Sequence, residues 1–364
     1  MSSKRALLLF IILCIVGVNL ALAGDTNNKD RLLPVMTRNM DAGSDFGLLL
    51  TEPLQQGVAD TFQEMLFSDM ADRANGLALE IRANNPYLVG LQEITVLTVA
   101  DSEGNQQPVV DQLQLLMAAL EKNGLHYTVV QRQTNLAIPF GPVGFADSDA
   151  VLARTDLQVS QLKLEAVQAG HFAAAFPFTV PGISVSVPRG WIAVDAKLRG
   201  KPFRFVTTHL ESFDQSPVVP EQYRGMFQGG QTLELLSGPL NTERPVILAG
   251  DLNSGPFIVD PAVTPFSPVG PAYNMLITAG LTDPWTVTHP NVSAFTWPLF
   301  LEDFPRPSSP SQRIDVILAS GTGITSTSAV LTGVNPLAPA SDVFPAGLWT
   351  SDHAGVVATF TLLP

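Results

Sequence analysis

The segment Val246-Ile247-Leu248-Ala249-Gly250-Asp251-Leu252-Asn253 joins a short apolar run to a carboxylate and an amide. Aliphatic and β-branched residues in a run of this length predict a buried strand, so we expect the polar pair at the edge of a sheet. Three earlier segments have the same order of apolar and polar residues. They lead to Asn39 and Asp41, to Gln92 and Glu93, and to His209.

Two later segments have the opposite order. Asp315 precedes the apolar run 316–318, and Asp352-His353 precedes the run 354–357. If all six polar ends meet at one edge of the core, the last two strands must run against the first four. The sequence therefore predicts mixed or antiparallel sheets rather than a doubly wound parallel sheet.

Such an arrangement collects many ionisable groups in one place. The groups are Asp41, Glu93, Asp251, Asp315, Asp352, His209 and His353. Carboxylates at close range repel one another and resist ionisation unless a cation lies among them. Oxygen donors without cysteine favour Mg²⁺, or else Mn²⁺ or Ca²⁺, over Zn²⁺. We therefore expect a metal-assisted reaction.

Composition limits the class of protein. The 364 residues include 20 Lys and Arg and 33 Asp and Glu, for a formal net charge of -13, which excludes a broad basic surface but not a small cationic site. The one cysteine, Cys14, excludes a disulfide scaffold and a cysteine-based zinc site. No G-x-S-x-G, P-loop or H-E-x-x-H segment occurs, so serine hydrolase, nucleotide-switch and zincin functions are excluded.

The N-terminus has the pattern of an export signal. Lys4 and Arg5 precede an apolar run over 6–18, and Ala21-Leu22-Ala23 supplies small residues for cleavage. We predict a signal peptide over residues 1–23, a single domain over 24–364, and a secreted or periplasmic protein. The run is too short for a stable membrane span. Lipid anchoring at Cys14 is the alternative, which the bulky Leu13 disfavours.

Apolar periodicity places the secondary structure. Strands are predicted at 32–37, 87–91, 126–131, 150–153, 191–198, 203–208, 246–249, 314–318 and 354–360, and helices at 60–84, 110–122, 221–236 and 272–279. The first helix has a candidate break near Gly76. Proline-rich tracts over 256–271 and 298–310 predict long surface loops. Alternating helices and strands indicate an α/β or α+β domain.

Six motifs in order resemble those of the endonuclease/exonuclease/phosphatase superfamily, which includes DNase I-like nucleases, inositol polyphosphate 5-phosphatases and neutral sphingomyelinases. The motifs are Thr37-Arg38-Asn39-Met40-Asp41, Leu91-Gln92-Glu93, Thr208-His209-Leu210, Gly250-Asp251-Leu252-Asn253, Arg313-Ile314-Asp315 and Ser351-Asp352-His353. The resemblance implies a four-layer sandwich of two packed mixed β-sheets flanked by helices. Arg38 and Leu252 depart from common family residues, and both are expected to face away from the site.

The resemblance also implies a role for each polar residue. Glu93 would be the principal metal ligand, and Asn39 and Asp352 would complete or orient the metal shell. Asp41 is either a further ligand or a turn residue. Asp251 would orient or deprotonate the attacking water.

The remaining roles implied by the resemblance concern the phosphate. Asn253 and His209 would contact phosphate oxygens, and His209 is a candidate to protonate the leaving oxygen. Asp315 would hydrogen-bond His353 and stabilise its imidazolium, although a simple pair with Arg313 is the alternative. Arg189 precedes the His209 strand and is a weaker candidate for phosphate binding.

We therefore expect a secreted, divalent-metal-dependent phosphoesterase that uses activated water, with a nucleic acid or a phospholipid headgroup as substrate and no obligate protein partner. The alternative is a non-catalytic binding or interaction module on the same fold. The apolar tract Phe172–Phe178 predicts either a lipid contact or a buried hairpin or loop plug, and the role of Asp147-Ser148-Asp149 stays open.

Overall fold

Two β-sheets pack face to face in the computed structural model, which describes residues 31–44, 48, 52–180, 183–212, 221–256, 270–301, 306–307 and 309–363. The predicted signal peptide lies outside the described residues. Within these ranges, no helix has the length and apolar character needed to cross a bilayer.

The first sheet has seven strands in the order β15-β16-β1-β2-β5-β4, with β3 paired to β2. Its strands are β1 (Leu32–Asn39), β2 (Leu88–Ala100), β3 (Gln106–Asp111), β4 (Tyr127–Phe140), β5 (Val143–Arg154), β15 (Ile324–Thr332) and β16 (Gly355–Leu362). Strand β1 runs parallel to β2 and antiparallel to β16.

The second sheet has five strands in the order β14-β11-β10-β9-β6. Its strands are β6 (Leu162–His171), β9 (Gly190–Leu198), β10 (Lys201–His209), β11 (Val246–Asp251) and β14 (Asp315–Ser320). Strand β10 runs parallel to β11, and β14 runs antiparallel to β11. Both sheets are therefore mixed, and the reversed direction predicted for the strands after Asp315 and after His353 is confirmed.

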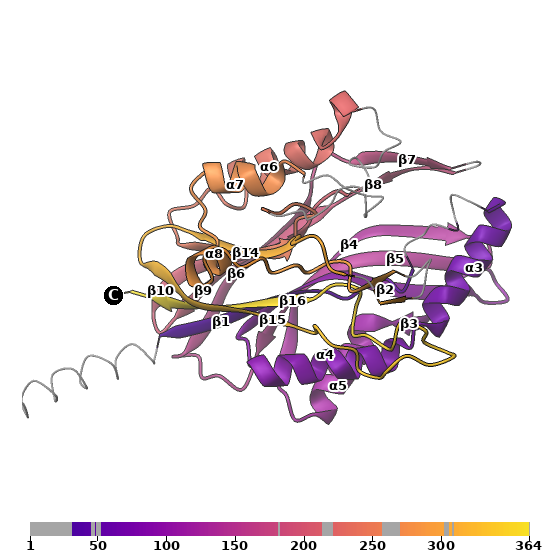
Figure 1. Ribbon diagram of the computed structural model, residues 1–364, viewed down its shortest axis with the longest axis horizontal. Helices are drawn as coiled ribbons and strands as arrows, with labels where there is room; N and C mark the ends of the chain where they lie inside the picture. Colours follow the sequence, from indigo (N-terminus) through magenta and orange to yellow (C-terminus); the bar gives the residue numbers. More distant parts are fainter. Residues whose placement is uncertain are drawn as a thin grey trace, which may run out of the picture.

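Helices cover the outer faces of the sheets, which confirms the four-layer sandwich (Figure 1). Helices α4 (Met70–Asn84) and α5 (Gln112–Lys122) pack on the first sheet, where Leu77 and Leu116 join Val89 in one buried cluster. Helices α6 (Met226–Ser237) and α7 (Ala272–Thr278) cover the second sheet. A third cluster fills the space between the sheets, with Val35 on one side and Phe205 on the other.

The surroundings of β11 explain why the apolar run 246–249 contains no polar residue. In β11, Ile247 and Ala249 pack between the sheets, whereas Val246 and Leu248 pack under α6 and α7. Both faces of the strand are buried, so every position must be apolar until the strand reaches the edge.

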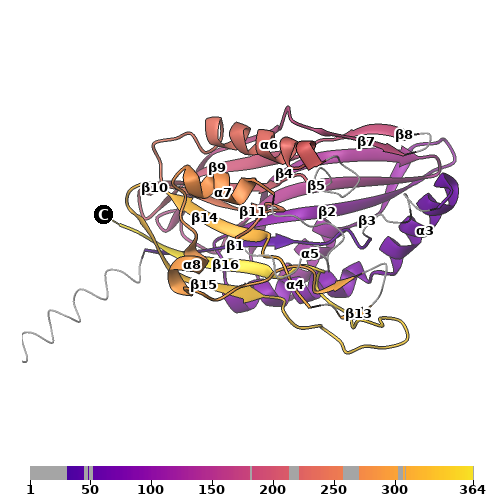
Figure 2. The ribbon, with the colours of Figure 1, turned by 45° about the horizontal axis from the view of Figure 1, so that its top comes forward.

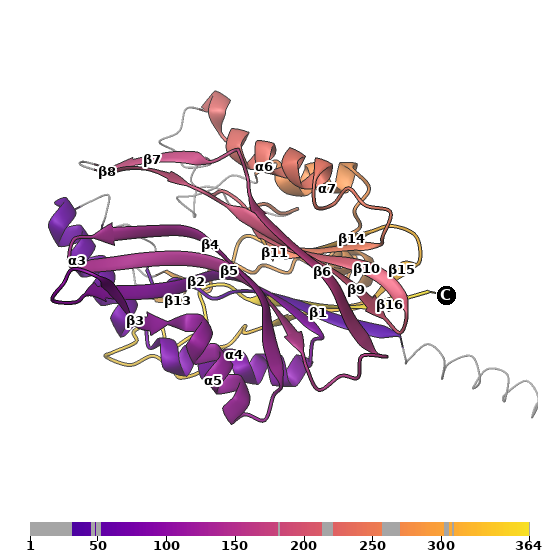
Figure 3. The same cartoon turned by 180° about the vertical axis from the view of Figure 1, so that it is seen from behind.

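The remaining elements are short or peripheral. They are α3 (Leu54–Phe67), α8 (Pro284–Thr288), a 3₁₀ turn (Glu221–Tyr223), the hairpin of β7 (Phe176–Val180) and β8 (Ile183–Val187), and the ribbon of β12 (Phe300–Leu301) and β13 (Arg306–Pro307). The apolar tract divides between the core and this hairpin: Phe172 is buried and Phe176 begins β7. Figure 3 shows the hairpin projecting from the α6 side toward the end that carries α3.

All nine predicted strands are present, but several helix boundaries differ. The predicted helix 60–84 is two helices, and the break falls at Ser68-Asp69 rather than at Gly76. Asp69 takes a left-handed conformation with φ 53°, and its side chain accepts a hydrogen bond from the Asp72 amide as a cap. The predicted helix 110–122 begins only at Gln112, because Asp111 caps it and Val110 lies in β3.

Strands β3, β6 and β15 were not predicted, because their exposed positions weaken the apolar pattern, and the short strands β7, β8, β12 and β13 were not predicted either. Most of the first proline-rich tract, residues 257–269, lies outside the described residues. The second tract, 298–310, contains β12 and β13.

Candidate active site

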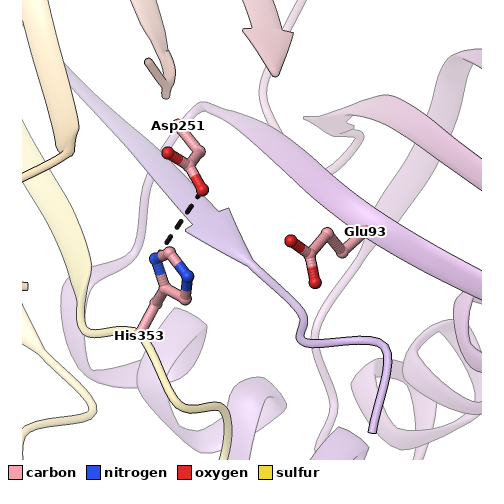
Figure 4. Close-up of side chains that lie close together, drawn as sticks. All are labelled: Glu93, Asp251 and His353. Atoms are coloured by element: carbon pink, nitrogen blue, oxygen red, sulfur yellow. Dashed lines mark ion pairs between the residues drawn. The ribbon is translucent and has the colours of Figure 1, made fainter. Parts of the chain in front are cut away.

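Glu93, Asp251 and His353 meet at one edge of the sandwich (Figure 4). One ligand atom from each lies within 4.8 Å of the others, although the residues come from β2, β11 and the segment before β16. Parallel pairing aligns the ends of neighbouring strands, and antiparallel pairing brings Asp315 opposite Asp251. The topology therefore gathers the polar ends as the residue order predicts.

Glu93 reaches the site through a β-bulge. The register between β2 and β5 shifts between Leu91 and Ile94, and Glu93 has a left-handed φ of 56°. A bulge re-aims a side chain without ending its strand. The Ala42 amide donates to Oε2 of Glu93 at 3.2 Å, which holds the carboxylate against the chain after β1.

Gln92, the neighbour of Glu93, joins the two sheets. Its Oε1 accepts from the Thr37 hydroxyl at 3.1 Å, and its Nε2 donates to Thr207 Oγ1 on β10 at 2.9 Å. All three side chains are buried. This bridge fixes the position of β2 relative to β10 and thereby the distance of Glu93 from the second sheet.

Asp251 is held by hydrogen bonds at both oxygens. Asn39 Nδ2 donates to Oδ2 at 3.0 Å, and the backbone N–H of Asn253 donates to Oδ1 at 2.9 Å. The predicted metal-shell residue Asn39 thus orients a carboxylate in this arrangement. Burial, followed by the charge of Asp315, raises the pKa of Asp251 to about 6.

Asp315 and His353 form the pair that the family resemblance implies. Nδ1 of His353 lies 2.8 Å from Oδ2 of the fully buried Asp315. A carboxylate only accepts, so Nδ1 carries the hydrogen and Nε2 is directed toward Asp352, whose Oδ1 lies 3.9 Å away. The alternative partner of Asp315 is not used, because Arg313 forms its ion pair with Asp283.

The surroundings of His353 favour the imidazolium. Burial alone would lower its pKa, but the charges of Asp315, Asp352 and Asp251 outweigh burial and raise the pKa well above its usual value. Arg38 donates to the His353 carbonyl and pairs with Glu80 of α4 at 3.2 Å. Arg38 therefore supports the backbone of His353 from behind the site.

His209 has the opposite electrostatic environment. Nη1 of Arg189 lies 3.0 Å from Nδ1 of His209, and a guanidinium only donates, so Nδ1 accepts and Nε2 carries the hydrogen. Burial, followed by the charges of Arg189 and His353, lowers the pKa of His209 well below its usual value. A neutral imidazole is a hydrogen-bond donor and not a proton source, which argues against His209 as the acid for the leaving oxygen.

Asn253 places its amide beside His209. Its Nδ2 lies 3.1 Å from His209 Nε2 and donates to the Leu210 carbonyl at 3.0 Å. Asn253 has a left-handed φ of 46° and is only half-buried, so the amide lies where the strand ends and solvent begins.

Asp41 and Asp352 have different positions in the site. Asp41 pairs with Arg73 at 3.0 Å and accepts from the Gly43 amide at 2.6 Å, at a left-handed φ of 59°. Of its two predicted roles, this geometry favours the turn residue over the metal ligand. Asp352 accepts at Oδ2 from Trp297 Nε1 at 2.9 Å, and burial raises its pKa to about 6.

The donor set fits a divalent cation. Burial, followed by the charge of Asp352, raises the pKa of Glu93 to about 8, so these carboxylates resist ionisation together. A cation between them would relieve this repulsion. His353 belongs to the group of three by distance, but an imidazolium is not a ligand. Glu93 and Asp251 are the carboxylates of that group, and Asp352, whose charge acts on Glu93, is a further candidate ligand.

Asp147 and Asp149, whose role the sequence leaves open, form a buried acidic pair behind Glu93. Asn135 lies at a bulge of β4, and its Nδ2 donates to Asp147 at 3.3 Å and to Asp149 at 2.9 Å. Burial, together with Asp147, raises the pKa of Asp149 well above its usual value. The charge of Arg189 acts on both acids. Arg189 thus serves the acids and His209 at once, which its position in the sequence does not reveal.

Comparison with known proteins agrees with the fold. A family model described as Endonuclease/Exonuclease/phosphatase family matches residues 62–353. Among solved structures, the chain is similar to an endonuclease/exonuclease/phosphatase from Beutenbergia cavernae DSM 12333, with a TM-score of 0.54 and 22% identity, covering 92% of this chain and 72% of that one. A family protein from Leptotrichia buccalis C-1013-b has a TM-score of 0.54 and 15% identity, with coverage of 90% and 98%.

A third similar structure, from Bacteroides vulgatus, has a TM-score of 0.52 and 17% identity, with coverage of 91% and 99%. At these identities the solved structures support the fold alone. A search of curated proteins found no match.

Proposed function

Because the chain belongs to the endonuclease/exonuclease/phosphatase family, we propose that it is an exported enzyme that hydrolyses a phosphodiester or phosphomonoester of a nucleic acid or a phospholipid headgroup. Members of this family are metal-dependent phosphodiesterases, nucleases and phosphatases, so the chain is a metal-dependent hydrolase of ester bonds. The reaction, the ion and the substrate class within that description are our proposal.

Glu93 and Asp352 would hold the cation, with Mg²⁺ as our choice and Mn²⁺ or Ca²⁺ as alternatives. When bound, the ion neutralises charge on the phosphoryl group. Asn39 would keep Asp251 in position beside this pair, because its amide donates to the Asp251 carboxylate at 3.0 Å.

Asp251 would accept a proton from the attacking water. With a pKa of about 6, its carboxylate is mostly ionised at neutral pH and still basic enough to take up a proton. The two hydrogen bonds that fix its oxygens leave little rotational freedom, so water would be deprotonated in one orientation.

Three donors would neutralise the phosphoryl oxygens. His353 would supply an imidazolium, and Asn253 and His209 would supply neutral N–H groups, which lie 3.1 Å apart. Such fixed donors stabilise charge that develops during attack, because they require no reorganisation. Since His209 is neutral, His353 is the better candidate to protonate the leaving oxygen.

The convergence of Glu93, Asp251 and His353 carries this proposal. We would measure hydrolysis of bis-p-nitrophenyl phosphate with Mg²⁺ and with EDTA. Wild type should lose activity in EDTA, and Glu93→Ala should be inactive with Mg²⁺. Glu103→Ala, on an exposed turn, is the matched control. If no metal-dependent activity appears and Glu93→Ala equals wild type, the protein is the alternative binding module.

The substrate class needs a separate comparison. Plasmid DNA, sphingomyelin liposomes and inositol phosphates would be tested at equal enzyme concentration. Plasmid nicking that disappears in His353→Ala supports a nuclease, whereas turnover confined to liposomes rejects a nuclease. Export is tested by N-terminal sequencing of the mature protein, which we expect to begin at Gly24.

A further inference from the structure

A cavity of about 190 Å³ lies between the end of α3, the start of α4 and the segment 343–349. Four aromatic residues line it, namely Phe67, Phe300, Phe344 and Trp349. The rings of Phe300 and Trp349 stack with centroids 6.4 Å apart and an interplanar angle of 27°. Figure 2 shows the segment between β15 and β16 extending toward the end of the molecule that carries α3.

The walls of this cavity continue into the metal site. Gly43 lines the cavity and follows Ala42, whose amide donates to Glu93 at 3.2 Å. Phe300 follows Leu299, whose amide donates to the Asp352 carbonyl at 2.7 Å. The same short segments therefore position Glu93 and Asp352 and form the aromatic walls. Arg73, which lines the cavity, pairs with Asp41, whose charge acts on Glu93, so the cavity lies beside the candidate site.

The charged groups of the lining already have partners. Arg73 pairs with Asp41 at 3.0 Å, and Glu64 accepts from the Ser44 hydroxyl at 2.7 Å. Trp349 donates from Nε1 to the Ala346 carbonyl at 2.8 Å. The lining therefore offers aromatic and aliphatic surface to an occupant, with Arg73 already paired and Glu64 hydrogen-bonded. A flat apolar ring gains contact with this surface.

Two apolar side chains that line the cavity are largely exposed to solvent. Phe67 is 69% exposed and Val343 is 74% exposed, although both line the cavity. Since a cavity of about 150 Å³ accommodates benzene, the present volume suits one ring with small substituents. We propose that the cavity binds an aromatic ring carried by the phosphoester substrate, either an aryl group or a nucleobase. This inference rests on the proposed phosphoesterase function.

The first test uses three diesters that share a p-nitrophenyl leaving group and differ in the retained group, which is phenyl, thymidine or ethyl. Phe67→Ala removes one wall without disturbing the core. We expect KM to rise roughly three- to ten-fold, the scale of one aromatic contact. A rise for the phenyl and thymidine esters alone places the retained ring in the cavity, and a rise for all three places the leaving ring there. A larger effect on the thymidine ester identifies a nucleobase, and a larger effect on the phenyl ester identifies an aryl group.

Leu66→Ala is the matched control, because Leu66 is 47% exposed on the same helix and does not line the cavity. Phe344→Ala tests the opposite wall, so the result does not depend on one variant. The cavity variants Phe67→Ala and Phe344→Ala should both keep the wild-type Tm. Unchanged KM for every ester in both cavity variants would overturn the inference and leave the phosphoesterase intact.

Equilibrium binding separates this inference from the function on which it rests. Calorimetry with Mg²⁺ would compare phenyl phosphate and ethyl phosphate. We expect Phe67→Ala to weaken phenyl phosphate roughly three- to ten-fold and to leave ethyl phosphate unchanged. Ring-selective binding without turnover would refute the enzyme and keep the cavity assignment. Equal binding of the two phosphates to wild type would refute the cavity assignment.

Discussion

Asp315, at the start of β14, accepts a 2.8 Å hydrogen bond from Nδ1 of His353, which precedes β16 in the other sheet. The bond therefore joins the two halves of the sandwich at the edge where the proposed chemistry occurs. It fixes the imidazole ring and leaves Nε2 directed toward Asp352. The pair links the packing of the sheets to the protonation state of one side chain.

The first prediction concerns the pH dependence that this pair creates. The pKa of His353 lies well above its usual value, so activity that needs the imidazolium persists through neutral pH and declines as pH rises through that pKa. Asp315→Asn removes a negative charge and should move the decline to lower pH. The pH profile of kcat would show this. Asp195→Asn, whose carboxylate pairs with Arg204 on the second sheet, should leave the profile in place. An unmoved profile in Asp315→Asn would refute the pair.

A second prediction concerns the cost of Glu93 in the metal-free protein. Its pKa of about 8 exceeds the unfolded value of 4.5, so its contribution to stability is present below pH 4.5 and is lost as pH rises toward 8. The side chain is 27% exposed, which reduces the cost through solvent screening. In EDTA at pH 8, Glu93→Gln should therefore raise the free energy of unfolding by about 1 kcal/mol. Urea unfolding would measure it.

Added metal should make wild type more stable than Glu93→Gln, the reverse of the order expected in EDTA. If Mg²⁺ binds only the folded protein, through Glu93, it should raise the Tm of wild type and not that of Glu93→Gln. The exposed Glu103→Gln should behave as wild type with and without metal. Equal Mg²⁺ responses in all three proteins would show that Glu93 does not hold the ion.

The third prediction concerns the buried guanidinium of Arg189. Its charge acts on Asp147, Asp149 and Glu211, so Arg189→Leu removes a shared cation from beside several buried carboxyl groups. We expect a loss of about 3 kcal/mol in the free energy of unfolding at pH 7. The loss should shrink toward pH 5, because raised carboxyl pKa values let the folded state take up protons. Arg154→Leu breaks the pair with the more exposed Asp156 and a cation–π contact with Tyr87, and it should cost less than Arg189→Leu, about 1 kcal/mol. A pH-independent loss in Arg189→Leu would contradict this account.

The sequence predicts the meeting of Glu93, Asp251 and His353, because strand direction follows from whether polar residues precede or follow each apolar run. It does not predict that Asp41 pairs with Arg73, since Arg73 lies on α4 and reaches Asp41 only through tertiary packing. The sequence also does not predict the charge state of His209, because Arg189 lies on another segment and contacts His209 only in the folded protein. The bulge at Glu93 also leaves no local signal, since an apolar run continues on both sides of it.

The last prediction concerns a close approach of β2 to β10 at Gly90. A Cβ added at Gly90 on β2 would lie 2.3 Å from the Thr207 hydroxyl oxygen, which already accepts from Gln92 at 2.9 Å. Gly90→Ala must therefore displace β10 or break the bridge that positions Glu93, and we expect a loss of about 1–3 kcal/mol in stability. Activity should fall with it. Gly229→Ala on α6 meets only ordinary contacts at 3.6 Å and should be neutral or stabilising. If steric conflict is the cause, adding Thr207→Ala to Gly90→Ala should recover part of the loss measured by urea unfolding, and a purely additive double variant would reject that cause.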